Sequence, residues 1–263
     1  MDSQRVIWDP AKYVEFGSYR DRPFFDLTGR IKAPAPRRVV DLGCGPGTLT
    51  AALARRWPDA QVVGVDSSAE MVDAANSIAG KPANLSFEHA DIAAWMPEPG
   101  TDVVVSNAAL QWVPGHQDLM RHWLAALEPG AWLAVQVPGN FDSPSHVLMR
   151  QLAESARWST ALAGVLRHED AVWDAGQYQQ LLLHAGCETD VWESTFYQLL
   201  AGARPVLEWV RGTALRPVMA ALDTAEGEAF EEEYARALDA AYPPGPDGTI
   251  FPFRRIFMVG RKH

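Results

Sequence analysis

The chain has 263 residues, a formal net charge of −10 and 48% hydrophobic residues, which suits one large α/β domain with insertions. Because basic residues form only short clusters, nucleic acid is not expected as a partner. No apolar run approaches the roughly 20 residues that cross a bilayer, and the N-terminus lacks the features of a signal peptide, so we expect a cytoplasmic protein without membrane contact.

The first half of the chain alternates between predicted strands and helices. A helical segment at 1–32 is expected to break at Arg22-Pro23, because proline restricts the residue before it. Strands are predicted over 37–42, 61–65, 85–87, 102–106 and 131–137, and helices over 47–57, 67–79 and 117–127. This alternation favours a doubly wound, mostly parallel sheet.

The second half loses that rhythm. Helices are predicted over 144–157 and 173–185, a strand over 188–199, a helical block over 204–242 and a last strand over 256–260. We expect the last strand to be antiparallel and inserted in the sheet. The helical block lies between the last two strands, which makes 204–246 a candidate lid.

The most informative motif follows the first strand and reads Asp41-Leu42-Gly43-Cys44-Gly45-Pro46-Gly47. Glycine lets a backbone approach a ligand closely, and the N–H groups at a helix start can bind an anionic group. The next strand ends in Asp66, which is placed to accept both hydroxyls of a ribose. The combination resembles the cofactor loop of class I S-adenosylmethionine-dependent methyltransferases, and this resemblance implies S-adenosylmethionine as the cofactor.

A nicotinamide dinucleotide fingerprint is the nearest alternative for this loop. Counted from Gly43 and Gly45, it requires glycine at position 48, where this chain has Thr48. A dehydrogenase therefore ranks last. S-adenosylmethionine has no phosphate, and its loop needs an acid such as Asp41 near the ammonium group.

Further cofactor contacts are expected where the next strands end, because ligands of doubly wound sheets bind beyond the carboxyl ends of the strands. Asp91 could accept a hydrogen bond from the adenine amino group with Ile92 against the ring, or it could cap a helical turn. Asn107 could face the reactive sulfonium, or it could be a turn residue. The predicted cofactor-binding residues are Asp41, Gly43, Gly45, Gly47, Asp66, Ser67, Asp91, Ile92 and Asn107.

Nearly the whole chain resembles the trans-aconitate 2-methyltransferase family. The resemblance rests on the cofactor loop and on motifs near both ends, among them Trp8-Asp9-Pro10, Arg20-Asp21-Arg22-Pro23, Ser106-Asn107-Ala108-Ala109-Leu110-Gln111-Trp112, Gly212-Thr213-Ala214-Leu215-Arg216-Pro217 and Phe251-Pro252-Phe253-Arg254-Arg255. It implies one Rossmann-like class I domain over 1–263, with a helical cap. It also implies methyl transfer to a carboxylate of trans-aconitate, giving a monomethyl ester and S-adenosylhomocysteine.

Carboxylate methylation makes specific demands on the site. A carboxylate is already ionised at pH 7, so no general base is needed. A trianion must instead meet local cations on this acidic protein, and arginine pairs best with carboxylates. Consecutive strand residues face opposite ways, so at most one of Arg254 and Arg255 should reach the pocket. The predicted substrate-binding residues are Tyr13, Arg22, Trp112, Tyr197, Thr213, Arg216, Arg254 and Arg255, with Arg20 as a further candidate.

Two alternatives to this function stay open. An O- or C-methyltransferase for an aromatic or apolar natural product would use the same loop, with His116 as a possible general base; otherwise His116 is a helix cap or a surface hydrogen bonder. A non-catalytic module could keep the cofactor site without turnover. The two cysteines fit a reducing compartment and, without clustered histidines, predict no metal site. The expected partner is a small anionic substrate, and the expected state is a monomer or homodimer.

Overall fold

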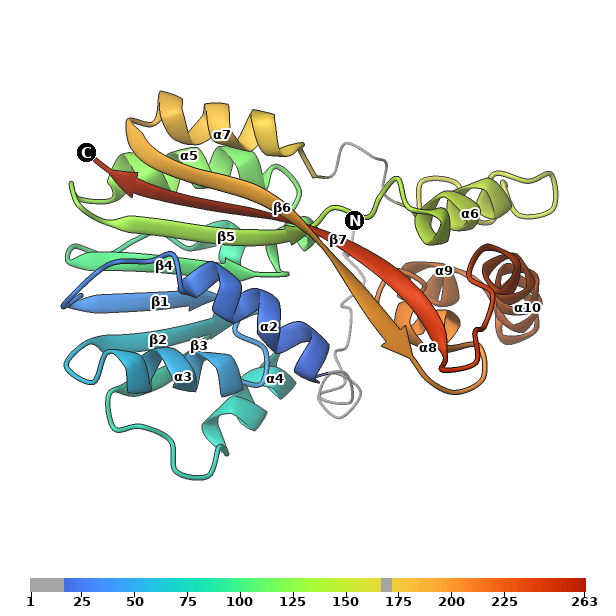
Figure 1. Cartoon of the computed structure of the whole chain (residues 1–263), viewed down its shortest axis with the longest axis horizontal. Coiled ribbons are helices and arrows are strands. Elements are labelled where there is room, and N and C mark those ends of the chain that lie inside the picture. Colours follow the sequence, from blue (N-terminus) through green and yellow to red (C-terminus); the bar gives the residue numbers. More distant parts are fainter. Residues whose placement is uncertain (1–16, 167–171) are drawn as a thin grey trace. The chain divides into compact units, whose positions relative to one another are not determined.

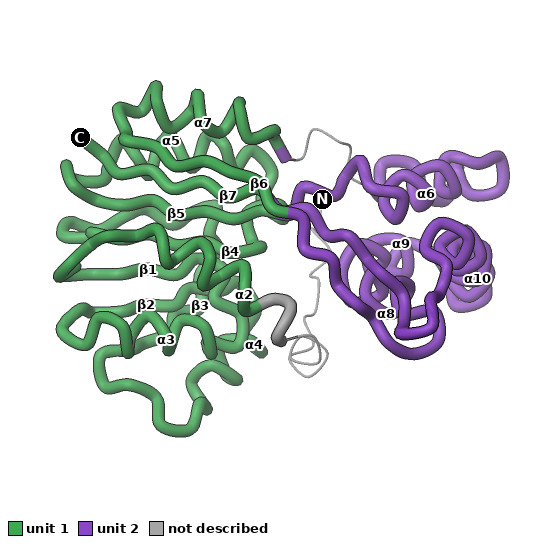
Figure 2. Tube along the Cα trace, viewed as in Figure 1, with its two compact units in different colours: residues 1–137, 173–194, 256–263 green, residues 138–172, 195–255 purple. Residues whose placement is uncertain are grey.

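The computed structural model describes residues 17–166 and 172–263 (Figure 1). The predicted residue Tyr13 and the first half of the predicted N-terminal cap lie outside the described residues. The chain divides into two compact units (Figure 2). The first unit contains the described residues of 1–137 with 173–194 and 256–263, and the second contains those of 138–172 with 195–255.

A seven-stranded sheet has the order β3-β2-β1-β4-β5-β7-β6. Strands β1 to β4 pair in parallel, as do β4 and β5, and the last strand is antiparallel and inserted beside β5. The predicted doubly wound α/β class is thereby confirmed. The strands are β1 (Arg38–Leu42), β2 (Gln61–Asp66), β3 (Leu85–His89), β4 (Thr101–Asn107), β5 (Trp132–Pro138), β6 (Cys187–Leu200) and β7 (Thr249–Lys262).

The central strands are apolar along their length because helices cover a parallel sheet on both faces. Val39 and Val40 of β1 and Val103 to Val105 of β4 are completely buried. The helices of the first unit are α2 (Gly17–Thr28), α3 (Thr48–Arg56), α4 (Ala69–Asn76), α5 (His116–Ala126) and α7 (Ala175–His184), with short 3-10 turns η1 (Ile92–Ala94) and η2 (Leu110–Trp112). The chain order reverses between β1 and β4, and the β1 loop lies at that switch point.

Two boundary predictions differ most from the structure. Helix α2 continues through Pro23 rather than breaking there, because buried Phe24 and Leu27 hold it on the sheet and the Thr28 hydroxyl donates to the Phe24 carbonyl at 2.8 Å. Strand β7 begins at Thr249, seven residues before the predicted start of the last strand. Buried and half-buried residues alternate from Phe251 to Arg255, as in a strand. The sequence does not show this alternation as an apolar pattern, because one proline and two arginines lie in the first half of β7.

The second unit is mainly helical. It contains α6 (Pro144–Ala153), α8 (Pro205–Arg211), α9 (Arg216–Ala221) and α10 (Thr224–Ala241), so the predicted helical block is three helices. Its core includes an aromatic cluster in which Trp209 packs against Phe251 and Phe253 at ring-centroid distances of 6.0 and 5.6 Å. No helix among the described residues has the length and apolarity required to span a membrane.

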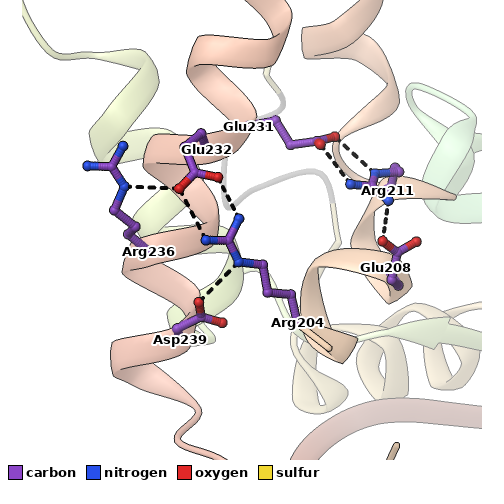
Figure 3. Close-up of polar contacts among 7 residues, drawn as sticks. All are labelled: Arg204, Glu208, Arg211, Glu231, Glu232, Arg236 and Asp239. Carbon is purple, nitrogen blue, oxygen red and sulfur yellow. Dashed lines mark hydrogen bonds and ion pairs between the residues drawn. The ribbon is translucent and has the colours of Figure 1, made fainter. Parts of the chain in front are cut away.

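A network of ion pairs joins α8 to α10 (Figure 3). Arg204 precedes α8 in the left-handed region, with φ of 49°, and its guanidinium donates to both oxygens of Glu232 at 2.5 and 3.1 Å. Arg211 at the other end of α8 donates to both oxygens of Glu231 at 2.7 and 3.0 Å. These forked pairs join both ends of the short helix α8 to α10.

Candidate active site

The loop after β1 turns at three glycines with positive φ, namely Gly43, Gly45 and Gly47. At two of these positions, Gly43 and Gly47, glycine is required by lack of space for a side chain as well as by the backbone conformation. A Cβ on Gly43 would lie 2.2 Å from the Cβ of Ala109, and a Cβ on Gly47 would lie 2.4 Å from the Phe87 ring. The loop therefore packs directly on the segment after β4 and on β3, with no room for side chains at these two positions.

Asp66 organises the loop from the end of β2. Its Oδ2 accepts the Gly45 N–H at 2.8 Å, and its Oδ1 accepts the Ser68 N–H at 2.9 Å. Burial raises the pKa of Asp66, while these backbone hydrogen bonds act in the opposite direction. The side chain is half-buried, and each carboxylate oxygen can accept more than one hydrogen bond. Neighbouring Ser67 is exposed.

Asp41 is a second, more deeply buried carboxyl beside this loop. It is 3% exposed, and its Oδ2 accepts the hydroxyl of the buried Thr50 at 2.7 Å. Burial is the main cause that raises the pKa of Asp41 to about 7, and the nearby charge of Asp66 adds to the rise. A cation bound near Asp41 would favour its ionised form. Thr50 was not among the predicted residues, although its place in the first turn of the following helix was a usable signal.

Asp91 and Ile92 lie in the turn after β3. The Asp91 Oδ1 accepts the Ala93 N–H at 2.9 Å, so Asp91 is the N-cap of η1, which was its alternative role. Contact with an adenine amino group stays a prediction. Ile92 is 6% exposed, and its Cδ1 lies 3.5 Å from the position that a Cβ on Gly43 would take. Its side chain thus borders the glycine loop.

Asn107 ends β4 with an uncompensated polar atom. It is 8% exposed, and its Oδ1 accepts no hydrogen bond within the described part of the chain. The following residue, Ala108, has a φ of 55°, which is rare for a residue with a side chain. Its N–H donates to the Gln136 carbonyl at 2.9 Å, which holds this turn. A buried carbonyl oxygen beside a strained turn suits a ligand with a polarised or cationic group.

His116 is neither a surface residue nor free to act as a base in this conformation. It is 1% exposed; its Nδ1 lies 3.2 Å from the Val113 carbonyl and its Nε2 2.7 Å from the Tyr178 hydroxyl. The carbonyl requires a proton on Nδ1, which leaves Nε2 to accept from the tyrosine. Burial lowers the pKa of His116. The imidazole therefore connects α5 to α7.

The predicted substrate residues of the second unit differ in exposure. Arg255 is 3% exposed, with its guanidinium carbon 4.6 Å from the Phe253 ring centroid, whereas Arg254 is half-buried. Arg216 is the half-buried first residue of α9, and the Thr213 hydroxyl lies 3.3 Å from the Trp209 carbonyl. The other members of the predicted set are Tyr197, which is 74% exposed, Arg22, whose exposed guanidinium lies 3.7 Å from Asp26, and half-buried Trp112.

The chain is in the class of Rossmann-like α/β proteins. This class is defined here by the order of the strands, the glycine loop at the switch point and the acid that ends β2. Residues 16–191 match the family model described as a methyltransferase domain. The described residues contain no group of three or more His, Cys, Asp or Glu side chains placed to hold a metal ion.

Comparison with known proteins narrows the family. The chain is 55% identical over 257 residues to a trans-aconitate 2-methyltransferase from Rhodococcus jostii, covering 97% of this chain and 99% of the relative. It is 53% identical over 269 residues to the protein of the same name from Streptomyces coelicolor, covering 100% and 89%. Among solved structures, the YcgJ protein from Bacillus subtilis has a TM-score of 0.58 at 17% identity, covering 92% of this chain and 98% of that one, and shows the shared fold. The chain belongs to the trans-aconitate 2-methyltransferase family of methyltransferases.

Proposed function

We propose that the protein transfers the methyl group of S-adenosylmethionine to a carboxylate of a small polycarboxylate, with trans-aconitate as the favoured substrate. The observation that carries the proposal is the loop of Gly43 to Gly47 held by Asp66, in a chain that is similar over nearly its full length to relatives of that name. A cytoplasmic location and a monomeric or dimeric state are part of the same proposal.

The residues of the first unit fit the cofactor. Gly43 and Gly47 have no side chain that would clash with the neighbouring Ala109 and Phe87, and Asp66 has acceptor capacity left for the ribose hydroxyls. We assign Asp41 to the ammonium group and the Asn107 Oδ1 to the positively charged sulfur and its methyl group. When bound, the cofactor supplies an electrophilic methyl group on a sulfonium. The remaining proposed contacts are Gly45, Ser67, Asp91 and Ile92.

The acceptor oxygen needs no proton removal, because a substrate carboxylate is ionised at neutral pH. The enzyme has to align this oxygen with the methyl group at about 3 Å and strip its water. The hydrogen bonds on both ring nitrogens of His116 support this view, since they leave no lone pair for a base. No residue is assigned a proton-transfer role.

Cations of the second unit are assigned to the substrate charge. Arg216, together with one of Arg254 and Arg255, would compensate a trianion on a protein of net charge −10. Arg254 and Arg255 differ in burial, as expected of successive strand residues. Tyr197 is proposed as a hydroxyl donor, and so is Thr213, whose hydroxyl would exchange its bond to the Trp209 carbonyl for one to the substrate. Tyr13, Arg22 and Trp112 stay predictions from the resemblance.

Replacing His116 by alanine is expected to leave carboxylate methylation within about tenfold of wild type, because no base is needed. It should lower the free energy of unfolding by about 1–3 kcal/mol, since Tyr178 and Val113 lose a buried partner. The lowered pKa of His116 also means that its stabilising contribution is present above about pH 6.5 and is lost below it. Initial rates and urea unfolding at pH 5.5 and 8 test this. A thousandfold rate loss would mean that the acceptor is not a carboxylate.

The test of the function is a turnover assay with S-adenosylmethionine and a panel of acids: trans-aconitate, cis-aconitate, citrate, isocitrate and an aromatic carboxylate. Mass spectrometry detects one added methyl group, and alkaline hydrolysis shows that it is an ester. We expect trans-aconitate to be the best acceptor. A product from the aromatic acid alone would support the natural-product alternative, and cofactor binding without any product would support the non-catalytic one.

A further inference from the structure

Asn140 of the second unit has a fixed and uncompensated amide donor. It lies two residues after the end of β5 and is 3% exposed. Its Oδ1 accepts the backbone N–H of Arg254 at 2.7 Å, and its own carbonyl accepts the Ser143 hydroxyl at 2.6 Å and the Ser143 N–H at 2.9 Å. Its Nδ2 donates to no acceptor among the residues that the structure describes.

The orientation of this amide follows from its partner. A backbone N–H can only donate, so the amide atom that faces Arg254 has to be the oxygen, and the NH₂ group has to face the other way. The Ser143 hydroxyl and N–H both donate to the Asn140 backbone carbonyl, which restrains the backbone from which the side chain projects. The donor is therefore held in one direction, and buried donors without partners are rare in folded proteins.

The surroundings of Asn140 define what this donor can bind. The Arg254 guanidinium donates to the Gly139 carbonyl at 3.1 Å and lies 3.6 Å from the exposed carboxylate of Asp142. The backbone N–H of Gly139 donates to the Arg254 carbonyl at 2.9 Å, so the residues 139–140 and Arg254 are held side by side. Asn140 thus supplies a fixed N–H donor, and Arg254, which is hydrogen-bonded to the neighbouring Gly139, supplies a guanidinium. An anionic group that only accepts hydrogen bonds, such as a carboxylate, suits both donors.

We propose that Asn140, acting beside Arg254, binds a substrate carboxylate that is not methylated and thereby selects polycarboxylates. This inference rests on the proposed function. A carboxylate that receives both a hydrogen bond and a guanidinium is a weaker nucleophile, because its lone pairs are engaged. The pair thus suits an anchoring carboxylate better than the one that attacks the methyl group. Asn140 was absent from the residues predicted from the sequence.

The test compares trans-aconitate with three dicarboxylates in the full-length protein. Itaconate, glutaconate and mesaconate each correspond to trans-aconitate without a different one of its three carboxylates, and each is measured as a competitive inhibitor of trans-aconitate methylation. The variants are Asn140→Ala, which removes the donor, and Asn140→Asp, which keeps the acceptor for the Arg254 N–H and turns the donor into a negative acceptor. Asn84→Ala is the matched control, because the Nδ2 of Asn84 is satisfied by the carbonyls of Ala54, Trp57 and Ala60.

We expect Asn140→Ala to raise the KM of trans-aconitate at least tenfold and Asn140→Asp to raise it further, with the KM of the cofactor within twofold of wild type. One of the three dicarboxylates should bind Asn140→Ala as well as wild type, since it lacks the anchored carboxylate. Asn84→Ala should lower the melting temperature and leave the ratios among the four acids unchanged. If Asn140→Ala does not fold, Asn140→Asp carries the comparison.

Two results would overturn the inference while leaving the function intact: unchanged KM values in both variants, or an equal loss for trans-aconitate and all three dicarboxylates. A wild-type protein that methylates aromatic acids and no polycarboxylate would instead overturn the proposed function, and the inference with it.

Discussion

Replacing Asp66 by alanine is expected to weaken the binding of S-adenosylmethionine at least a hundredfold. The carboxylate is the proposed acceptor for the ribose hydroxyls, and it also holds the Gly45 and Ser68 N–H groups. Loss of two hydrogen bonds to a charged group corresponds to about 3 kcal/mol or more, which is a factor of about a hundred in the dissociation constant. Titration calorimetry with S-adenosylmethionine and with S-adenosylhomocysteine measures the change.

Comparing Asp66→Asn with Asp66→Ala separates the contact of Asp66 with the cofactor from its support of the glycine loop. Asp66→Asn retains one acceptor oxygen for the loop and removes the charge, so it should fall between wild type and Asp66→Ala. Asp59→Ala, an exposed acid before β2, is the control and should bind the cofactor as wild type does. An unchanged affinity in Asp66→Ala with an unchanged melting temperature would remove Asp66 from the ribose site.

The sequence predicts the first unit better than the second for a physical reason. The strands β1, β2, β4 and β5 are apolar runs between glycine, proline and capping residues, so local composition marks them. Ser68, for example, is the N-cap of α4, with its hydroxyl accepting the Met71 N–H at 3.2 Å. The glycine loop and Asp66 are adjacent because parallel strands place their carboxyl ends at one edge of the sheet, which is a property of the topology alone.

Contacts between distant parts of the chain carry no such local signal. His116 meets Tyr178, 62 residues away, and Asn140 meets Arg254, 114 residues away. A lone histidine or asparagine in a sequence has many possible roles, and only the fold brings its partner within hydrogen-bond distance. The N-cap role of Asp91 is different, because its partner Ala93 is local and the capping geometry is common.

Replacing Asp41 by asparagine is expected to stabilise the empty protein at pH 8 and to weaken cofactor binding. Burial raises the pKa of Asp41 from 3.8 to about 7. Below about pH 4 both the folded and the unfolded states hold the proton. As the pH rises toward 7, the unfolded state loses its proton first, so the folded state loses stability. The difference between the folded and unfolded pKa corresponds to a loss of roughly 4 kcal/mol in the free energy of unfolding at pH 8. Asparagine avoids this loss, but it brings an extra unpaired buried donor that costs about 1–3 kcal/mol.

Urea unfolding of wild type and Asp41→Asn at pH 5 and pH 8 tests the sign. The free energy of unfolding of Asp41→Asn, relative to that of wild type, should increase from pH 5 to pH 8. Asp102→Asn is the control. Hydrogen bonds from Arg37 lower the pKa of Asp102, so its carboxylate stabilises the folded state above its unfolded pKa. This variant should therefore be less stable than wild type at both pH values. A variant Asp41→Asn that is equally destabilised at both pH values would show that Asp41 acts through packing and its Thr50 hydrogen bond alone.

The same buried carboxyl should couple cofactor binding to proton release. If Asp41 faces the ammonium group, the bound cation favours the ionised carboxylate, so binding expels the proton that the empty site holds below about pH 7. The affinity for S-adenosylmethionine should therefore rise with pH up to about 7 and then level off, and calorimetry in buffers of different ionisation enthalpy should detect the released proton. In Asp41→Asn both effects should vanish. Persistence of the proton release in that variant would assign it to another group, with Asp66 as the next carboxyl to test, because burial also raises its pKa. A buried carboxyl that destabilises the ligand-free protein is thus the expected consequence of a site that is complementary to a cation.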